Sequence, residues 1–217
     1  MIQYSIAGEP EEMEWMSVEN NSERVMVFVD LENVLKISDR FIELGYKIDL
    51  RDMVRTVVGE RKLVEVYFFD CIESEGDPRI ALHDALRRYG YKVNARIGHD
   101  RYEGKQKEVD VAMGCEIVFQ ACVNSYDTAI IVSGDRDFFP ALERVHAVCK
   151  RVEVASFFEA LSRKLSACCD TVHFLNTVPI FYRIHAPVTV EYSESLVTEE
   201  EITMIGGALT MLEEAMA

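Results

Sequence analysis

The sequence predicts an α/β protein, a three-layer α/β/α sandwich around a mostly parallel sheet. Short apolar runs of strand length alternate with longer segments of helical periodicity. The runs are nearly continuous in apolar residues, which is typical of parallel strands covered by helices on both faces. Pro78 suits the first position of a helix, and Gly45 and Gly90 suit helix ends. The 217 residues suffice for one domain of full size with its own core.

Strands and helices follow one another in a regular order along the chain. Strands are expected at 25–30, 62–70, 91–97, 127–132, 151–157 and 171–175. Helices are expected between them at 31–44, 78–89, 108–124, 137–149 and 159–168. Because helices connect successive parallel strands, each crossover should be right-handed. The sequence therefore predicts a doubly wound sheet.

The pattern changes at both ends of the chain, which predicts three regions. Residues 1–24 are an acidic N-terminal tail, 25–178 form the α/β domain, and 179–217 are a C-terminal extension. The extension is expected to hold short strands and a final helix, which Thr198 opens with a capping box. The apolar stripe of that helix must be buried, either on its own domain or on a second subunit as a possible homo-oligomer.

The net charge of −15 is unevenly distributed. Residues 185–217 hold seven acidic residues and no basic one, whereas 79–107 hold eight Lys and Arg against three acidic residues. Taken alone, this basic segment is best explained as a solvated helix face and the loop that follows it. The alternative is that it contacts the phosphates of a polyanionic partner.

Composition excludes several classes of protein. With 49% hydrophobic and 28% charged residues, the chain is not wholly disordered. No apolar run approaches the roughly 18 residues of a membrane helix, and the N-terminus matches neither a secretory signal nor a transit peptide. The six cysteines form no C-x-x-C pair. We therefore expect reduced thiols in a cytoplasmic protein without a membrane partner.

Carboxylates from three segments are expected at one edge of the sheet. Asp30 ends the first strand, Asp110 stands where a helix begins, and the fourth strand is followed by Asp135 and Asp137. In an open parallel sheet, ligands bind at the carboxyl ends of strands. Four carboxylates there would repel one another, and a hard divalent cation, Mg²⁺ or Mn²⁺, would relieve the repulsion. Each acid also has a structural explanation, as a strand end or a helix cap.

Three motifs resemble the NYN domains of the PIN-like nuclease superfamily. They are V-F-V-D-x-x-N at 27–33, K-x-V-D-V-A at 107–112 and D-T-A-I-I-V-S-G-D-R-D-F-x-P at 127–140. The resemblance covers about residues 24–176, with the motifs in the family's order and spacing. It implies a Rossmann-like sandwich with strand order 3-2-1-4-5, and hydrolysis of RNA phosphodiester bonds with Mg²⁺ or Mn²⁺.

The resemblance also implies roles for individual residues. The metal cluster would consist of Asp30, Asp110, Asp135 and Asp137. Asn33 would assist it as a catalytic residue, and Ser133 would assist it as a polar helper near the substrate. We expect Asp30 and Asp135 to bind the principal ion, and the other two acids to complete the cluster directly or through water.

Basic residues near the cluster are candidates for substrate binding. Lys107 is the candidate cation for the charged transition state. Arg96, Arg101 and Lys105 would hold the substrate backbone. A tyrosine, Tyr102 or Tyr91, would stack on a base of single-stranded RNA, although core packing is the simpler role for Tyr91.

Two positions depart from the family's pattern. Glu108 stands where many relatives have glycine, and Glu116 stands where relatives often have a further Asp, six residues after Asp110. Six residues of a regular helix turn through about 600°, so Glu116 joins the metal ligands only if Asp110 precedes the first full turn. Asp70, at the end of the second strand, is either a site member or a structural acid.

The competing function is a non-catalytic PIN-like module that binds structured or single-stranded RNA, or a protein. The acidic tails and Glu108 favour this alternative, whereas the intact carboxylates favour the ribonuclease. A phosphatase of the haloacid dehalogenase type is disfavoured because the first strand ends in D-L-E-N and not in D-x-D. Hydrolysis by a catalytic triad is disfavoured because no G-x-S-x-G elbow is present.

Overall fold

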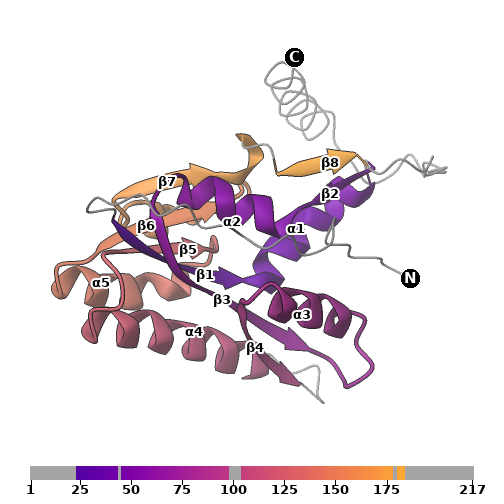
Figure 1. Cartoon of the computed structure of the whole chain (residues 1–217), viewed down its shortest axis with the longest axis horizontal. Helices are drawn as coiled ribbons and strands as arrows, with labels where there is room; N and C mark the ends of the chain where they lie inside the picture. Colours follow the sequence, from indigo (N-terminus) through magenta and orange to yellow (C-terminus); the bar gives the residue numbers. More distant parts are fainter. Residues whose placement is uncertain (1–22, 44, 98–103, 178–179, 184–217) are drawn as a thin grey trace.

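A six-stranded sheet forms the centre of the molecule (Figure 1). The structure is a computed structural model that describes residues 23–43, 45–97, 104–177 and 180–183. The strands are β1 (Arg24–Asp30), β3 (Lys62–Ile72), β4 (Lys92–Ile97), β5 (Thr128–Val132), β6 (Arg151–Ser156) and β7 (Thr171–Phe174). They lie in the order β4-β3-β1-β5-β6-β7, and every neighbouring pair is parallel. The predicted α/β class is confirmed.

The strand order agrees with the expected one, except that the sheet has one more strand. Numbered along the sheet's own strands, the first five have the order 3-2-1-4-5, and β7 adds a sixth strand beside β6. The expected strand at 171–175 is therefore part of the main sheet. It extends the sheet's edge on the side away from β4.

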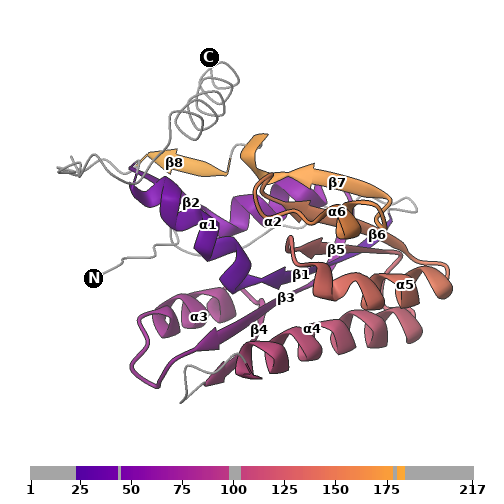
Figure 2. The ribbon, with the colours of Figure 1, turned by 180° about the vertical axis from the view of Figure 1, so that it is seen from behind.

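Helices cover both faces of the sheet and complete three layers (Figure 2). They are α1 (Leu31–Glu43), α2 (Leu50–Val58), α3 (Arg79–Arg88), α4 (Gly104–Cys122), α5 (Phe139–Ala147) and α6 (Arg163–Ser166), with the short 3₁₀ helices η1 (Arg136–Phe138) and η2 (Leu175–Thr177). One hydrophobic cluster joins the sheet to α1, α2 and α3, and a second joins it to α4, α5 and α6. In the described part of the chain, no helix is long and apolar enough to cross a membrane.

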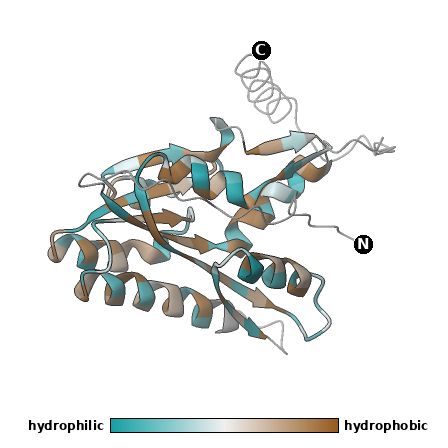
Figure 3. Cartoon of the chain, viewed as in Figure 1, coloured by the Kyte–Doolittle hydropathy of each residue, from teal (hydrophilic) through white to brown (hydrophobic). Residues whose placement is uncertain are grey.

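The alternation along β1 decides which way its last residue faces. Val25, Val27 and Val29 belong to the cluster beneath α1 and α2. Met26 and Phe28 belong to the cluster beneath α4 and α5. Because side chains alternate along a strand, Asp30 points to the α4 side. Figure 3 shows hydrophobic residues along these central strands and hydrophilic ones on the outward side of α2.

One strand and one helix were not predicted, β2 (Tyr46–Ile48) and α2, whereas β8 (Phe181–Arg183) lies in the extension, where short strands were expected. The two strands β2 and β8 pair antiparallel. Between β2 and β3 lies α2, in a region where the sequence analysis placed no element. Asp49 caps α2, because its carboxylate accepts hydrogen bonds from the amides of Arg51 and Asp52 at 2.8 and 3.2 Å.

Two helices have bounds that differ from the predicted ones. The helix expected at 108–124 begins at Gly104, and the helix expected at 159–168 is only the single turn α6. Ser162 caps α6 by accepting a hydrogen bond from the amide of Leu165 at 3.2 Å. The segment before it makes backbone contacts with Gly134, which hold it in a loop.

The described residues of the C-terminal extension pack on the α/β domain. Ile180 and Phe181 are buried, and the ring of Phe181 lies 4.3 Å from that of Phe41 in α1. The domain boundary at residue 178 stays a prediction. The expected final helix and its apolar stripe lie outside the described residues, as does the acidic tail up to residue 22.

Candidate active site

Asp30 is a buried carboxylate at the carboxyl end of β1. Its exposed fraction is 5%. The amide of Asn33 donates a hydrogen bond to Oδ1 at 3.1 Å, and the hydroxyl of Ser133 donates one to Oδ2 at 3.0 Å. Burial raises the pKa of Asp30 to about 7, and the negative charges of Asp110 and Glu32 raise it further, against the lowering effect of the two hydrogen bonds. We expected repulsion between the acids to be the main effect on the carboxylates of this site, but burial is the larger cause of the raised pKa of Asp30.

Asn33 and Ser133 join β1 to the loop that follows β5. The Asn33 side-chain oxygen accepts a hydrogen bond from the Gly134 amide at 3.2 Å. The Ser133 hydroxyl accepts one from the Asp135 amide at 3.1 Å while it donates to Asp30. These bonds fix the start of α1 and the loop after β5 relative to one another, and Ser133 links the carboxylate of Asp30 to the backbone amide of Asp135.

Asp110 lies in α4, on the side of the sheet that Asp30 faces. Val109, Met113 and Ile117 bury the inner side of this helix, and Asp110 is half-buried. Its charge raises the pKa of both Asp30 and Lys36. Asp30 and Asp110 are therefore close enough for their charges to act on one another.

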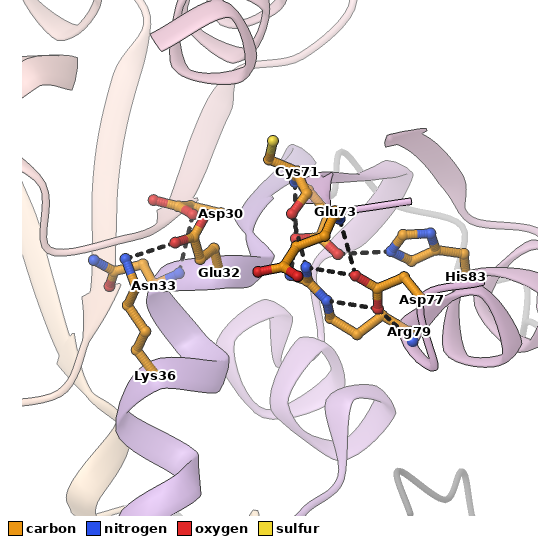
Figure 4. A network of polar contacts seen from close by, with 10 residues as sticks. Asp30, Glu32, Asn33, Lys36, Cys71, Glu73, Asp77, Arg79 and His83 are labelled. Atoms are coloured by element: carbon orange, nitrogen blue, oxygen red, sulfur yellow. Dashed lines mark hydrogen bonds and ion pairs between the residues drawn. The ribbon is translucent and has the colours of Figure 1, made fainter. Parts of the chain in front are cut away.

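Glu32 and Lys36 also belong to this site, and the sequence analysis missed both. The Lys36 ammonium lies 2.6 Å from a carboxylate oxygen of Glu32, one turn earlier in α1 (Figure 4). This hydrogen bond raises the pKa of Lys36, and the charges of Asp30 and Asp110 add to the effect. A four-residue spacing of Glu and Lys at the start of a helix was the available signal, since such residues face one another.

Asp135 and Asp137 lie farther out. A carboxylate oxygen of Asp135 accepts a hydrogen bond from the Asp137 amide at 2.9 Å and so caps η1. The Asp137 side chain is 71% exposed and lies 3.9 Å from the Arg136 guanidinium. Asp30 and Asp110 thus form an inner pair, Asp135 is joined to it through Ser133, and Asp137 lies at the exposed rim.

Glu116 lies apart from the inner pair. Since α4 begins at Gly104, Asp110 is well inside a regular helix, and Glu116 is about 120° away around its axis. Its carboxylate accepts a hydrogen bond from the Gln120 amide at 2.7 Å. Burial raises the pKa of Tyr67, in the middle of β3, and the charge of Glu116 adds to this effect. The condition under which Glu116 could join the metal ligands is not met.

Asp70 is directed to the opposite face of the sheet. Its side chain is fully buried and accepts hydrogen bonds from Arg79 at 2.9 Å and from His83 at 2.7 Å. Figure 4 labels these two partners. Arg79 also binds Asp77, and although burial acts to raise the pKa of Asp77, hydrogen bonds from Arg79 hold it at about 2. Of the two explanations for Asp70, the structure supports the structural acid.

The predicted substrate-binding residues are only partly described. Arg96 in β4 and Lys107 in α4 are exposed. Arg101 and Tyr102 lie outside the described residues, and so does the side chain of Lys105. Tyr91 is half-buried, with its ring 5.6 Å from that of Phe68, which confirms core packing as its role.

The donor atoms fit an open metal site better than a closed one. Among the residues that the structure describes, no three histidine, cysteine or acidic side chains lie close enough together to hold a metal ion. Mg²⁺ keeps several waters and is commonly bound through one or two carboxylates and substrate phosphates. The pair formed by Asp30 and Asp110 supplies oxygen ligands of this kind, with negative charge that a cation would neutralise.

Comparisons with known proteins agree with the α/β fold. The protein LabA (low amplitude and bright) of Synechococcus elongatus is 27% identical over 165 residues, which cover 73% of this chain and 87% of LabA. A crystal structure of a protein of unknown function from Vibrio parahaemolyticus has the same fold, with a TM-score of 0.59 and 24% identity over 71% of this chain and 93% of that one. The family model of the NYN domain matches residues 24–176, the part that holds the sheet and every acid of the site. The chain therefore belongs to the NYN domain family, which indicates a nuclease-like function that involves RNA.

Proposed function

We propose that this protein is a metal-dependent ribonuclease that hydrolyses RNA phosphodiester bonds at the inner acidic pair. One observation carries the proposal: the Asp30 carboxylate is buried beside the charges of Asp110 and Glu32, at the carboxyl end of the central strand. Clustered like charges with little solvent cost several kcal/mol unless a counter-charge is present. A site that tolerates this cost is a candidate for cation binding and catalysis.

Asp30 and Asp110 are the residues that would hold Mg²⁺ or Mn²⁺, with Asp135 and Asp137 acting through water. When bound, the ion supplies a water molecule of lowered pKa and neutralises charge on the phosphoryl oxygens. Ser133 and Asn33 hold Asp30 and the Asp135 loop in place through the hydrogen bonds described above. Their role is to orient the acids and not to react with substrate.

Cations around the pair would position the RNA. Lys36 lies beside the acids, and Lys107 and Arg96 are exposed on α4 and β4. Together with Arg101 and Lys105, these residues would contact backbone phosphates. Binding through phosphates predicts an affinity that falls as the salt concentration rises.

Cleavage of a labelled single-stranded RNA with Mn²⁺, with Mg²⁺ or with EDTA tests the proposal. The wild type should cleave only with a divalent ion, and Asp30→Asn should abolish cleavage. The matched control is Asp84→Asn, which removes one carboxylate from the exposed side of α3, on the other face of the sheet. A contaminating nuclease would be as active in the Asp30→Asn preparation as in the control.

Isothermal titration with Mn²⁺ gives a second readout that does not depend on activity. The wild type and Asp84→Asn should bind Mn²⁺ with equal affinity, and Asp30→Asn should not bind it. Binding of RNA without cleavage under every condition would support the alternative, a non-catalytic RNA-binding module. The exposed position of Asp137 is the observation that favours this alternative.

Two wider proposals concern the setting of this activity. All six cysteines are free thiols, which suits the reducing environment of the cytoplasm. A homo-oligomer formed through the C-terminal helix stays a proposal, and light scattering on the full chain tests it.

A further inference from the structure

An exposed aromatic ring lies at the same edge of the sheet as the acids. Phe158 follows β6 directly after the buried Phe157, and its exposed fraction is 51%. Its ring lies 4.3 Å from the ring of Phe174, in the neighbouring strand β7, with an interplanar angle of 32°. The two rings are in contact, and the face of Phe158 that is open to solvent forms an exposed apolar surface.

Hydrogen bonds fix the backbone that carries this surface. The Phe158 amide donates to the side-chain oxygen of Asn176 at 2.8 Å. Asn176 is buried, and its side-chain amide donates to the Glu159 carboxylate at 3.3 and 3.4 Å. Because the ring is already held in place, a ligand that binds to it loses little free energy to ordering.

Backbone contacts place Phe158 close to the acidic site. The Ser162 amide donates to the Gly134 carbonyl at 3.0 Å. A Cβ on Gly134 would lie 2.1 Å from the carbonyl oxygen of Ala160, so the two segments of the backbone are in contact at this point. Gly134 immediately precedes Asp135, and Ala160 is two residues from Phe158.

The sheet itself sets the spacing between the acids and the ring. The ends of β1, β5, β6 and β7 follow one another along the edge. With neighbouring strands about 4.8 Å apart, the end of β7 lies about 14 Å from the end of β1. A few nucleotides of an extended single strand span this distance.

Positive charge accompanies the ring on the same segment. Arg163 and Lys164 are exposed in α6, and the Lys164 ammonium lies 4.0 Å from the centre of the Phe139 ring. The carboxylate of Glu159 is the opposing charge, and it is engaged by Asn176. An aromatic surface with cations beside it is complementary to a nucleobase and its phosphate.

We propose that Phe158, supported by Phe174, stacks on an unpaired base of the RNA that is cleaved at Asp30, while Arg163 and Lys164 contact the adjoining phosphates. The proposal rests on the ribonuclease function and narrows its substrate to single-stranded RNA, because a base in a duplex does not offer its face. The sequence analysis expected Tyr102 or Tyr91 to stack on a base. The proposal assigns this role to Phe158, at the end of a different strand.

The test compares RNA binding by variants in the inactive Asp30→Asn background. A fluorescein-labelled single-stranded 12-nucleotide RNA is titrated and anisotropy is measured, with the same RNA as a duplex for comparison. Phe158→Ala should weaken binding of the single strand by roughly 5- to 100-fold, as expected for loss of one stacked base. Phe158→Trp should restore the affinity, and duplex binding should not respond to either change.

The matched control is Phe119→Ala, which removes an exposed phenylalanine from α4, at an exposed fraction of 58%. It should leave the affinity unchanged. A 2-aminopurine base placed at successive positions of the RNA reports stacking directly: its fluorescence should be quenched at one position by protein with Phe158 and not by Phe158→Ala.

The possible failures are distinguishable. If the wild type cleaves RNA and Phe158→Ala binds and quenches like its parent, the stacking proposal is wrong and the ribonuclease proposal stands. If the protein neither binds nor cleaves RNA, both proposals are wrong. If Phe158→Ala and Phe119→Ala weaken binding equally, the loss is not specific to this edge, which also overturns the stacking proposal.

Discussion

Removing the Asp30 carboxylate should stabilise the metal-free protein while it abolishes metal binding. The folded environment raises the pKa of Asp30 from 3.8 to about 7, mainly through burial. One pKa unit corresponds to about 1.4 kcal/mol, so the charged form costs about 4 kcal/mol in the folded protein at pH 8. Asp30→Asn keeps the shape and removes the charge. Its one side-chain oxygen can still accept the hydrogen bond from the Asn33 amide, and its amide nitrogen can donate to the Ser133 hydroxyl, which then no longer donates to residue 30.

The pH dependence has a definite sign. A carboxyl whose pKa is raised on folding binds its proton more tightly in the folded state, so its presence favours folding at low pH. As the pH rises from about 4 to about 7, this contribution is lost, and above pH 7 the full cost of the charge applies. The difference in unfolding free energy between Asp30→Asn and the wild type should therefore grow over this range and level off.

Urea unfolding in EDTA at pH 5, 6, 7 and 8 measures this difference, with Asp84→Asn as the control. In a protein of this size, about 4 kcal/mol corresponds to a rise in Tm of roughly 8–16 °C. Adding Mn²⁺ should stabilise the wild type and the control but not Asp30→Asn. A variant less stable than the wild type at pH 8 in EDTA would refute the reasoning, because it would mean that the folded protein favours the charged form.

Three further predictions concern single side chains. Lys36→Ala should raise Mn²⁺ affinity in calorimetry by up to about fivefold, since it removes a cation beside Asp30 and releases Glu32; a lower affinity would contradict this. Gly134→Ala should lower the unfolding free energy by roughly 1–3 kcal/mol, because the new Cβ overlaps the backbone of Ala160, whereas Gly76→Ala, which has room, should be neutral in the same denaturation experiment. Glu153→Gln should be destabilising at pH 7 and lose this effect as the pH falls from about 4.5 to about 2, because His173 and Arg61 hold the pKa of Glu153 at about 2 against the effect of burial; equal differences at pH 7 and pH 3 would count against it.

The sheet could be predicted because its strands are buried on both faces. A run such as that of β5 has no exposed position, so its apolar character is continuous and its ends are easily located. The segment 45–61 lacked this signal, since β2 has only three residues and its partner β8 is distant in sequence. Asp49 and the apolar pairs at 53–54 and 57–58 in α2 were the readable evidence for a capped amphipathic helix.

The sequence could predict which acids lie near the ends of strands, but not which of them face the site. Asp30 ends β1, and Asp70 lies two residues before the end of the neighbouring strand β3. The sequence could not tell that the two side chains face opposite sides of the sheet. That distinction depends on the register of each strand against its helices. The sequence could predict that Glu32 and Lys36 face one another on a helix. Their place in the site follows from their closeness to Asp110, which is 74 or more residues away along the chain.

The buried carboxylates of this domain differ in whether a positively charged side chain is bonded to them. This difference distinguishes structural acids from candidate functional ones. Asp70 is held by Arg79 and His83, and Glu153 by Arg61 and His173. Each of these acids has an arginine and a histidine within hydrogen-bond distance, which offsets the cost of burial. Among the described residues, Asp30 accepts hydrogen bonds from one amide and one hydroxyl, while the ammonium of Lys36, on which the charge of Asp30 acts, is bonded to Glu32. A fold that twice provides Arg and His for a buried acid, and at Asp30 instead adds further acids, supports the proposal that a cation from solution binds at Asp30.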